Sequence, residues 1–272
     1  MARVWDITAD ADAAIDAAVA AVFDGDCIVL PTDTVYGIGA DAASAHAVQG
    51  LLDAKNRGRD MPPPVLIAEV SMLRALSEEL TEDVLALAEA FWPGALTLIV
   101  KAHEHLQMDL GDSGGTIAVR VPDHEFTREL LRATGPLAVS SANVSGQPAA
   151  TTIEEAKRQL GKNVRVYLDG GPAGEGEAST IVDLTGATPT ILRQGRISRA
   201  ALAAVLPSLA EPVEQDAAAP EAEEAPEAEE EPEAEEEEEE EEKAEEREKA
   251  EEEAERGDTT RDSTSDVEQG RL

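Results

Sequence analysis

The amino-acid composition changes abruptly near residue 211, and this change limits how much of the chain can fold. From Glu211 the sequence is an acidic, alanine-rich run. Of the 58 acidic and 22 basic residues, 30 and 6 lie in residues 207–272, which leaves 28 and 16, a net charge of −12, for residues 1–206. The acidic run has almost no apolar side chain larger than alanine, so it cannot bury enough surface to offset the entropy lost on ordering.

We therefore expect one folded domain over residues 1–206, which is long enough for a sizeable core, and an acidic tail over 207–272. The tail is expected to be disordered or partly helical. A helix there would be supported by three glutamate–cation pairs at i,i+4 spacing, namely Glu239–Lys243, Glu245–Lys249 and Glu252–Arg256.

Neither a disulfide framework nor a membrane segment is predicted. The one cysteine, Cys27, lies in an apolar run, which favours a reducing compartment. The N-terminus lacks the apolar core of a signal peptide, and no apolar run reaches the length of a membrane span. A cytoplasmic location is the resulting expectation.

Short apolar runs alternate with helical patterns through the first 206 residues. Strands are predicted over residues 4–7, 27–30, 64–70, 95–102, 116–121, 137–141, 164–170, 179–185 and 190–195. Helices are predicted over residues 9–23, 43–54, 73–76, 81–91, 124–133, 153–160 and 198–206. Strands and helices alternate early, whereas loops alone join the late strands. This order favours an α/β fold with a mixed parallel and antiparallel sheet.

Several common sites are absent from the sequence. There is no G-x-x-x-x-G-K-[ST] phosphate-binding loop and no G-x-G-x-x-G that opens a helix after a strand. The four histidines have no C-x-x-C or H-E-x-x-H context, so neither a zinc site nor another metal ligand is identified. His103 and His105 are assigned to a solvated loop.

Dense polar turns follow two predicted strands. The run PTDTVYG, residues 31–37, follows the strand that ends at Leu30, and SSANVSG follows the strand at 137–141. Each hydroxyl or amide taken singly is more often a turn or cap residue. Together they predict a ligand pocket, because ligands bind beyond strand ends in open α/β sheets.

Basic residues near strand ends predict that this pocket receives anions. They are the cluster Lys55-Asn56-Arg57-Gly58-Arg59, the pair Arg193 and Arg196, and Arg120 inside an apolar strand. A buried arginine needs a carboxylate or an anionic ligand, so Arg120 pairs either with an acidic residue of the chain or with a ligand. The set suits a polyanion together with a small zwitterion.

Seven motifs resemble, in sequence order, the YrdC-type threonylcarbamoyl-AMP synthase family. They are PTDTVYGIGADA, AKNRGRDMPPPVLI, FWPGALTLIV, TIAVRVPDH, SSANVSGQP, EASTIVDLTG and ILRQGRIS, and they cover nearly all of residues 4–206. The resemblance implies a twisted mixed sheet around a positive cavity. It also implies that L-threonine, bicarbonate and ATP, with Mg²⁺, give threonylcarbamoyl-AMP and pyrophosphate for threonylcarbamoyladenosine formation in tRNA, with downstream transfer machinery as the partner.

The resemblance also implies roles for single residues. Lys55 and Arg57 match the K-x-R motif, which holds ATP phosphates and the bicarbonate-derived carboxylate, and are the catalytic candidates. Further ATP contacts are implied at Thr116, Ser141, Asn143 and Arg193, and threonine contacts at Thr34, Tyr36, Arg120 and Ser179. The chain departs from the family pattern at Gly58, where proline is usual, and at DMPPPVLIAE, which lacks the histidine of N-P-L-x-x-H.

Two alternatives remain open from the sequence. One is a carbamoyl-adenylate-forming paralogue with another substrate, or an inactive paralogue. The other is an RNA-binding module, which the net negative charge of both the domain and the tail opposes. Direct tRNA binding is accordingly expected to be weak or absent.

Overall fold

A computed structural model describes residues 2–174 and 176–210. The helices are α1 (Ala11–Phe23), α2 (Ala45–Ala54), α3 (Leu73–Leu76), α4 (Glu82–Phe91), α5 (Glu125–Thr134), α6 (Ile153–Leu160) and α7 (Arg199–Val205). The strands are β1 (Arg3–Asp6), β2 (Ile28–Leu30), β3 (Gly37–Asp41), β4 (Val65–Leu66), β5 (Leu96–Lys101), β6 (Thr116–Arg120), β7 (Leu137–Ser141), β8 (Val166–Asp169), β9 (Thr180–Asp183) and β10 (Thr190–Arg193).

The strands form one mixed sheet in the order β1-β8-β2-β3-β7-β4-β6-β5-β9-β10. Parallel pairs are β1/β8, β2/β8, β4/β6 and β5/β9, and the other neighbouring pairs are antiparallel. The predicted α/β fold with a mixed sheet is confirmed. Strands β2, β7 and β9, which are far apart in sequence, thus belong to the same sheet.

Strand β3 is the element that the sequence did not predict. It follows the polar turn directly and pairs with β2 on one side and β7 on the other. Two glycines in GIGAD weaken its strand pattern. Both sit close to neighbouring side chains, because a Cβ on Gly37 would lie 2.6 Å from Val139 Cγ1 and one on Gly39 would lie 3.0 Å from Leu30 Cδ2. The polar run 31–36 is therefore the loop of a β-hairpin.

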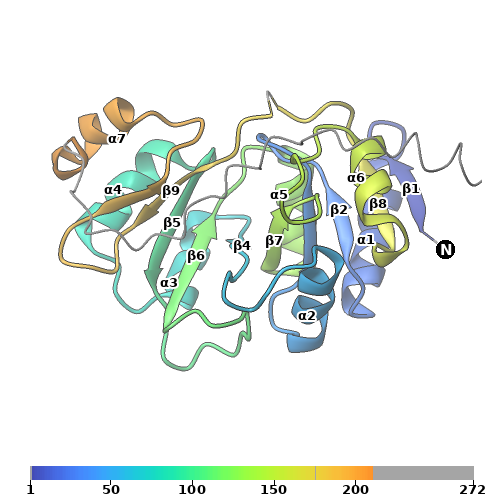
Figure 1. Cartoon of the computed structure of the whole chain (residues 1–272), viewed down its shortest axis with the longest axis horizontal. Coiled ribbons are helices and arrows are strands. Elements are labelled where there is room, and N and C mark those ends of the chain that lie inside the picture. Colours follow the sequence, from blue (N-terminus) through green and yellow to red (C-terminus); the bar gives the residue numbers. More distant parts are fainter. Residues whose placement is uncertain (1, 175, 211–272) are drawn as a thin grey trace, which may run out of the picture. The chain divides into compact units, whose positions relative to one another are not determined.

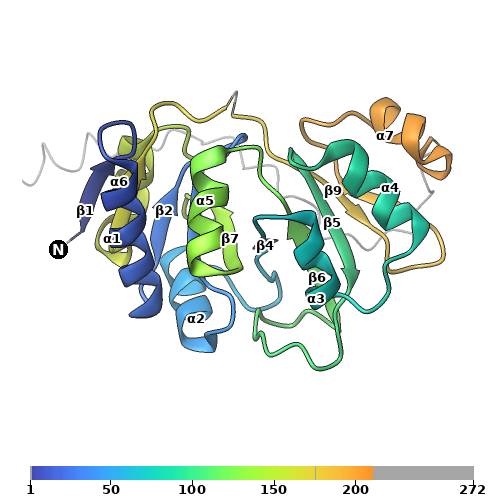
Figure 2. The ribbon, with the colours of Figure 1, turned by 180° about the vertical axis from the view of Figure 1, so that it is seen from behind.

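Helices cover both faces of the sheet. Helices α1 and α5 pack side by side on one face (Figure 2), and α6 lies against the other face near β8 (Figure 1). Ala14, Ala18 and Ala21 place the buried stripe of α1 against α5 and the sheet. The alanine-rich sequence of α1 thus lets the helix approach its neighbours closely.

The folded part continues slightly beyond the expected boundary at residue 206. Leu209, in the short 3-10 helix Pro207–Leu209, is 1% exposed, and its carbonyl accepts from Arg199 Nη1 at 3.0 Å. The expected tail, from residue 211 onward, lies outside the described residues. In the described part, no helix combines the length and apolarity needed to cross a bilayer.

Candidate active site

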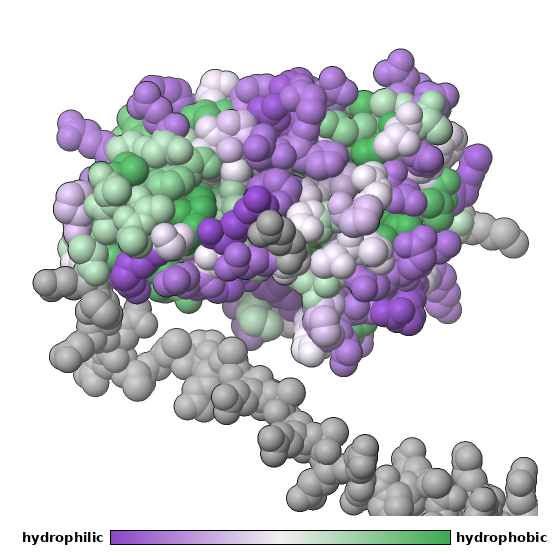
Figure 3. Space-filling model, turned by 90° about the horizontal axis from the view of Figure 1, so that it is seen from above, coloured by the Kyte–Doolittle hydropathy of each residue, from purple (hydrophilic) through white to green (hydrophobic). Residues whose placement is uncertain are grey.

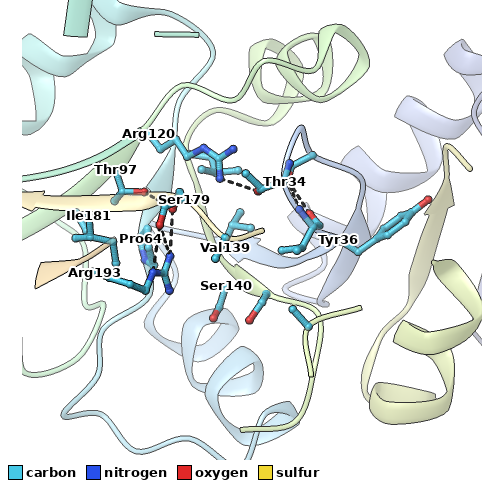
Figure 4. Close-up of a pocket in the computed structure, with 18 of the residues that line it drawn as sticks. Thr34, Tyr36, Pro64, Thr97, Arg120, Val139, Ser140, Ser179, Ile181 and Arg193 are labelled. Carbon is cyan, nitrogen blue, oxygen red and sulfur yellow. Dashed lines mark hydrogen bonds between the residues drawn. The ribbon is translucent and has the colours of Figure 1, made fainter. Parts of the chain in front are cut away.

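A cavity of about 440 Å³ opens on the middle of the sheet. Its walls come from the turn after β2, the chain before β4, strands β5 and β6, the end of β7, and strands β9 and β10 (Figure 4). The face seen from above carries hydrophilic residues over its centre, with apolar residues gathered toward the α7 end (Figure 3). A cavity of this size accommodates small-molecule ligands.

The PTDTVYG turn is fixed by its own first hydroxyl. Thr32 Oγ1 donates to the Val35 carbonyl at 2.6 Å and accepts from the backbone N–H groups of Thr34 and Val35. Thr32 is 5% exposed, so these bonds also satisfy a buried polar group. These bonds hold the turn together, and Thr34 lines the cavity.

Arg120 is oriented by three partners from two segments, the turn after β2 and the chain just before β5. Its Nη1 donates to Thr34 Oγ1 at 3.0 Å, its Nη2 to Asp33 Oδ1 at 2.6 Å, and its Nε to the Gly94 carbonyl at 2.9 Å. A guanidinium has five N–H donors, and three of those of Arg120 are used by described residues. The sequence left open whether Arg120 pairs with an acidic residue of the chain or with a ligand. The structure shows a pair with Asp33, and Arg120 also lines the cavity.

The cavity is electropositive. Arg57, Arg120 and Arg193 line it, and the described residues that line it include no carboxylate. Burial is the first cause that lowers the pKa of each guanidinium, yet arginine stays charged at any physiological pH. Arg57 Nη1 donates to Ser140 Oγ at 3.0 Å, and Arg57 Nε is buried without a partner in the described part of the chain. The wall thus holds three cations, of which Arg120 is already paired with Asp33.

Lys55 lies beside this wall, behind the turn that follows β7. Its Nζ donates to the Ser141 and Asn143 carbonyls, both at 2.6 Å, and to Asn143 Oδ1 at 3.3 Å. These three bonds use all three donors of the ammonium group. Burial, followed by the neighbouring Arg57, lowers the pKa of Lys55 to about 8. In this arrangement Lys55 holds the loop that carries Ser141 and Asn143.

Tyr36 and Thr116 are oriented differently from the other predicted contacts. The Tyr36 ring points away from the cavity (Figure 4), and its hydroxyl donates to the Gly171 carbonyl at 2.6 Å and accepts from Gly170 N at 3.1 Å. Thr116, at the start of β6, donates its hydroxyl to the Ser113 carbonyl at 2.7 Å. Neither hydroxyl is directed at the other predicted residues.

The structure brings most of the predicted site residues into one lining. Seven of them line the cavity with their neighbours: Thr34, Arg57, Arg120, Ser141, Asn143, Ser179 and Arg193. Tyr36 also borders it, Lys55 lies one layer behind, and Thr116 is outside the lining. The role of each as a substrate contact stays a prediction.

Sequence reasoning missed an important lining residue, Thr97. It lies in β5 with 1% exposure, and its Oγ1 is 2.9 Å from Ser179 Oγ. The signal was present as a single hydroxyl inside the apolar run ALTLIV. Ile99, Ala118 and Ile181, which were also unassigned, line the same part of the cavity.

The loop after the K-x-R motif has its own local geometry. A Cβ on Gly58 would lie 2.3 Å from Asp60 Oδ1, so the glycine leaves room for that carboxylate. Asp60 raises the pKa of Arg57 against the larger opposing effect of burial. Pro62 and Pro64 line the cavity at this side.

Similarity searches place these features among known proteins. The model of the Sua5, YciO and YrdC family, described as "Telomere recombination", matches residues 20–195. The chain is 52% identical to a Mycobacterium tuberculosis protein over 192 residues, 71% of this chain and 88% of the relative. It is 37% identical to the Bacillus subtilis protein named threonylcarbamoyl-AMP synthase over 197 residues, 72% of this chain and 57% of the relative.

Two solved structures share the fold. Pyrococcus abyssi Sua5 in complex with L-threonine gives a TM-score of 0.68 at 34% identity and covers 71% of this chain and 57% of its own. Escherichia coli YciO gives a TM-score of 0.64 at 26% identity and covers 73% of this chain and 98% of its own. The mixed sheet described above is the fold of these proteins.

Proposed function

We propose that this chain, which belongs to the Sua5, YciO and YrdC family, is a threonylcarbamoyl-AMP synthase. The relatives that carry this name and the threonine complex of Pyrococcus abyssi Sua5 support the proposal. The single structural observation that supports it best is the carboxylate-free lining, among the described residues, that contains Arg57, Arg120 and Arg193. The cavity suits a reaction between two anionic substrates.

The proposed reaction has two steps. The amine of threonine adds to bicarbonate with loss of water, which gives N-carboxy-threonine. A carboxylate oxygen of that intermediate attacks the α-phosphorus of ATP, the bond from phosphorus to the bridging oxygen breaks, and pyrophosphate leaves. The products are threonylcarbamoyl-AMP and pyrophosphate.

Fixed cations are the main contribution of the protein to this reaction. The attacking carboxylate and the triphosphate repel each other, and preorganised guanidinium groups lower that repulsion without reorganisation. In this proposal Arg57 and Arg193 hold the phosphates, and Arg120 holds the threonine carboxylate. Their planar forks suit both phosphates and carboxylates. No side-chain nucleophile is needed, so positioning supplies much of the rate enhancement.

Mg²⁺ is proposed to enter with ATP. In the described part of the chain, no three histidine, cysteine or acidic residues cluster as a metal site, and the lining offers donors rather than oxygen anions. The phosphates would therefore supply most ligands of the ion, as is usual for Mg²⁺. Bound there, it would reduce the charge of the triphosphate.

We further propose a cytoplasmic enzyme that passes its product to a tRNA threonylcarbamoyl-transfer system. Direct tRNA binding is expected to be weak, because the residues 1–206 carry a net charge of −12 as counted above. A steep salt dependence of tRNA binding would contradict this expectation.

The decisive experiment detects the product. Purified full-length protein is mixed with ATP, Mg²⁺, L-threonine and ¹⁴C-bicarbonate, and threonylcarbamoyl-AMP and pyrophosphate are measured. Labelled adenylate that requires all three substrates is expected. Product formation with carbamoyl phosphate but not with threonine and bicarbonate would instead assign the chain to the carbamoyl-adenylate paralogues.

A further inference from the structure

Thr97 and Ser179 form a buried hydroxyl pair in the wall of the cavity. Their Oγ atoms are 2.9 Å apart, and the two residues are 1% and 7% exposed. Arg193 Nη2 donates to Ser179 Oγ at 3.2 Å and to the Ser179 carbonyl at 2.9 Å. The side chain of Thr97 makes no other hydrogen bond within the described residues.

A count of donors shows what this pair offers a ligand. Each hydroxyl has one O–H donor and two acceptor lone pairs. Arg193 occupies one lone pair of Ser179, and the contact between the two hydroxyls consumes one O–H. If Thr97 donates to Ser179, the O–H of Ser179 and both lone pairs of Thr97 remain. If Ser179 donates to Thr97, the O–H and one lone pair of Thr97 remain. The pair can therefore donate to and accept from one ligand hydroxyl at the same time.

Neighbouring strands place this pair next to Arg120. The antiparallel register of β5 and β6 pairs Leu98 with Val119, and one step further it sets Thr97 beside Arg120. Side chains at paired positions of adjacent strands lie on the same face of the sheet, and both residues line the cavity. Figure 4 shows Thr97, Ser179 and Arg120 among the residues that line the cavity.

Three apolar residues, here called the apolar layer, lie next to Thr97, Ser179 and Arg120 on the sheet. Ile99, Ala118 and Ile181 are each two residues from Thr97, Arg120 and Ser179, respectively, and therefore share their face of the sheet. All three line the cavity. Such a layer can receive a methyl group beside the bound hydroxyl.

We propose that Thr97, together with Ser179, determines substrate specificity by hydrogen bonding to the side-chain hydroxyl of the amino-acid substrate. This inference rests on the proposed function. In the absence of a ligand hydroxyl, the buried pair would keep an unmet donor and acceptor, so valine, which has the shape of threonine without its hydroxyl, is rejected. The apolar layer separately favours threonine over serine.

The test compares Thr97→Val with the wild type. Valine keeps the size and β-branching of threonine, so the strand is preserved while the hydroxyl is lost. The ratio of kcat/KM for threonine to that for valine is measured by pyrophosphate release, and the Kd of each amino acid by calorimetry. We expect the threonine-to-valine ratio to fall about ten- to a hundred-fold, while the threonine-to-serine ratio stays the same.

Two further variants separate specificity from folding. Thr97→Ser retains the hydroxyl and is expected to keep most of the preference for threonine over valine. Thr127→Val removes another buried hydroxyl, one that donates to the Pro31 carbonyl at 2.6 Å from helix α5, and is expected to lower stability without changing the ratio.

The outcomes are distinguishable. If the wild type discriminates threonine from valine and Thr97→Val discriminates equally well, this inference is wrong and the proposed function stands. If Thr97→Val lowers both selectivity ratios together, the residue only supports the fold and the inference is again wrong. If the wild type neither binds threonine nor releases pyrophosphate with it, both proposals fail.

Discussion

Arg120 and Asp33 form a buried ion pair at the wall of the cavity, with 2.6 Å between Nη2 and Oδ1 and side chains that are 8% and 12% exposed. The same Asp33 oxygen accepts from the backbone N–H of Asp123 at 3.1 Å. Asp33 also accepts from Arg196 through its carbonyl at 2.8 Å. Asp33, which the sequence left without a role, thus helps to fix the direction of the Arg120 guanidinium, together with Thr34 and Gly94.

Arg120→Ala is expected to raise the KM for threonine at least tenfold, because it removes the proposed partner of the substrate carboxylate. It also leaves the Asp33 carboxylate buried and unpaired, and loss of one partner of such a pair costs about 3–5 kcal/mol. Steady-state kinetics with threonine and ATP varied separately, together with thermal unfolding, measure both effects.

The double variant Asp33→Asn with Arg120→Ala is the control. It removes the unpaired charge, so thermal stability should recover in part while the KM for threonine stays high. If stability and KM recover together, Arg120 acts through the fold and does not bind substrate.

Arg57→Ala and Lys55→Ala are both expected to abolish pyrophosphate release that depends on threonine and bicarbonate, but with different effects on stability. Arg57 is a lining residue, so its removal should leave the fold intact. Lys55→Ala leaves the Ser141 and Asn143 carbonyls without their donor, and an unsatisfied buried group costs about 1–3 kcal/mol. Near-normal turnover in either variant would contradict the assigned roles.

The lowered pKa of Lys55, about 8, predicts opposite pH trends in rate and stability. The rate should fall as pH rises through about 8, because the neutral amine loses one of the three donors that hold the 141–143 loop. Stability should rise between about 8 and the ordinary value of 10.5, since the unfolded chain binds the extra proton there.

Urea unfolding at several pH values from 7.5 to 10.5, which brackets the titration of a lysine, measures that slope in the wild type and in Lys55→Met. The slope contributed by Lys55 should vanish in Lys55→Met, which has no titrating group at this position. An identical slope in both proteins would show that the Lys55 amine does not titrate in this range.

Tyr36→Phe is expected to lower stability by about 1–3 kcal/mol while changing the KM for threonine less than twofold. The phenol donates to Gly171 and accepts from Gly170, so its loss leaves two backbone groups unsatisfied. Chemical denaturation and threonine titrations provide the two measurements. A large rise in KM with unchanged stability would instead support a direct contact between the phenol and threonine.

Removal of residues 211–272 is expected to leave kcat and KM unchanged, because all the proposed contacts lie before that segment. The truncation should follow Ala210 rather than Leu206, since Leu209 is buried. A chain that ends at residue 206 is the comparison, and it should unfold at a lower temperature. A large loss of activity in the longer truncated chain would assign a catalytic role to the acidic segment.

The sequence by itself determined which residues could form strands and helices, because hydrophobic periodicity and glycine or proline boundaries act locally. It also identified the arginines and several hydroxyls of the cavity, though not Thr97, since charged and polar groups next to apolar strands need partners. It missed β3, because the two glycines that hide its strand pattern are explained only by the side chains of β2 and β7 packed against them.

Only the tertiary structure decided which polar side chains bond to other parts of the protein and which line the cavity. In the PTDTVYG run, Thr32 bonds within the turn and Asp33 pairs with Arg120. Thr34 bonds to Arg120 at the cavity wall, and the Tyr36 hydroxyl bonds to Gly170 and Gly171. Thr32 bonds within the turn, whereas the directions of Asp33, Thr34 and Tyr36 are set by partners from distant segments. The contact of Thr97 with Ser179 has the same origin, since β5 and β9 are parallel neighbours and Ser179 immediately precedes β9, 82 positions from Thr97.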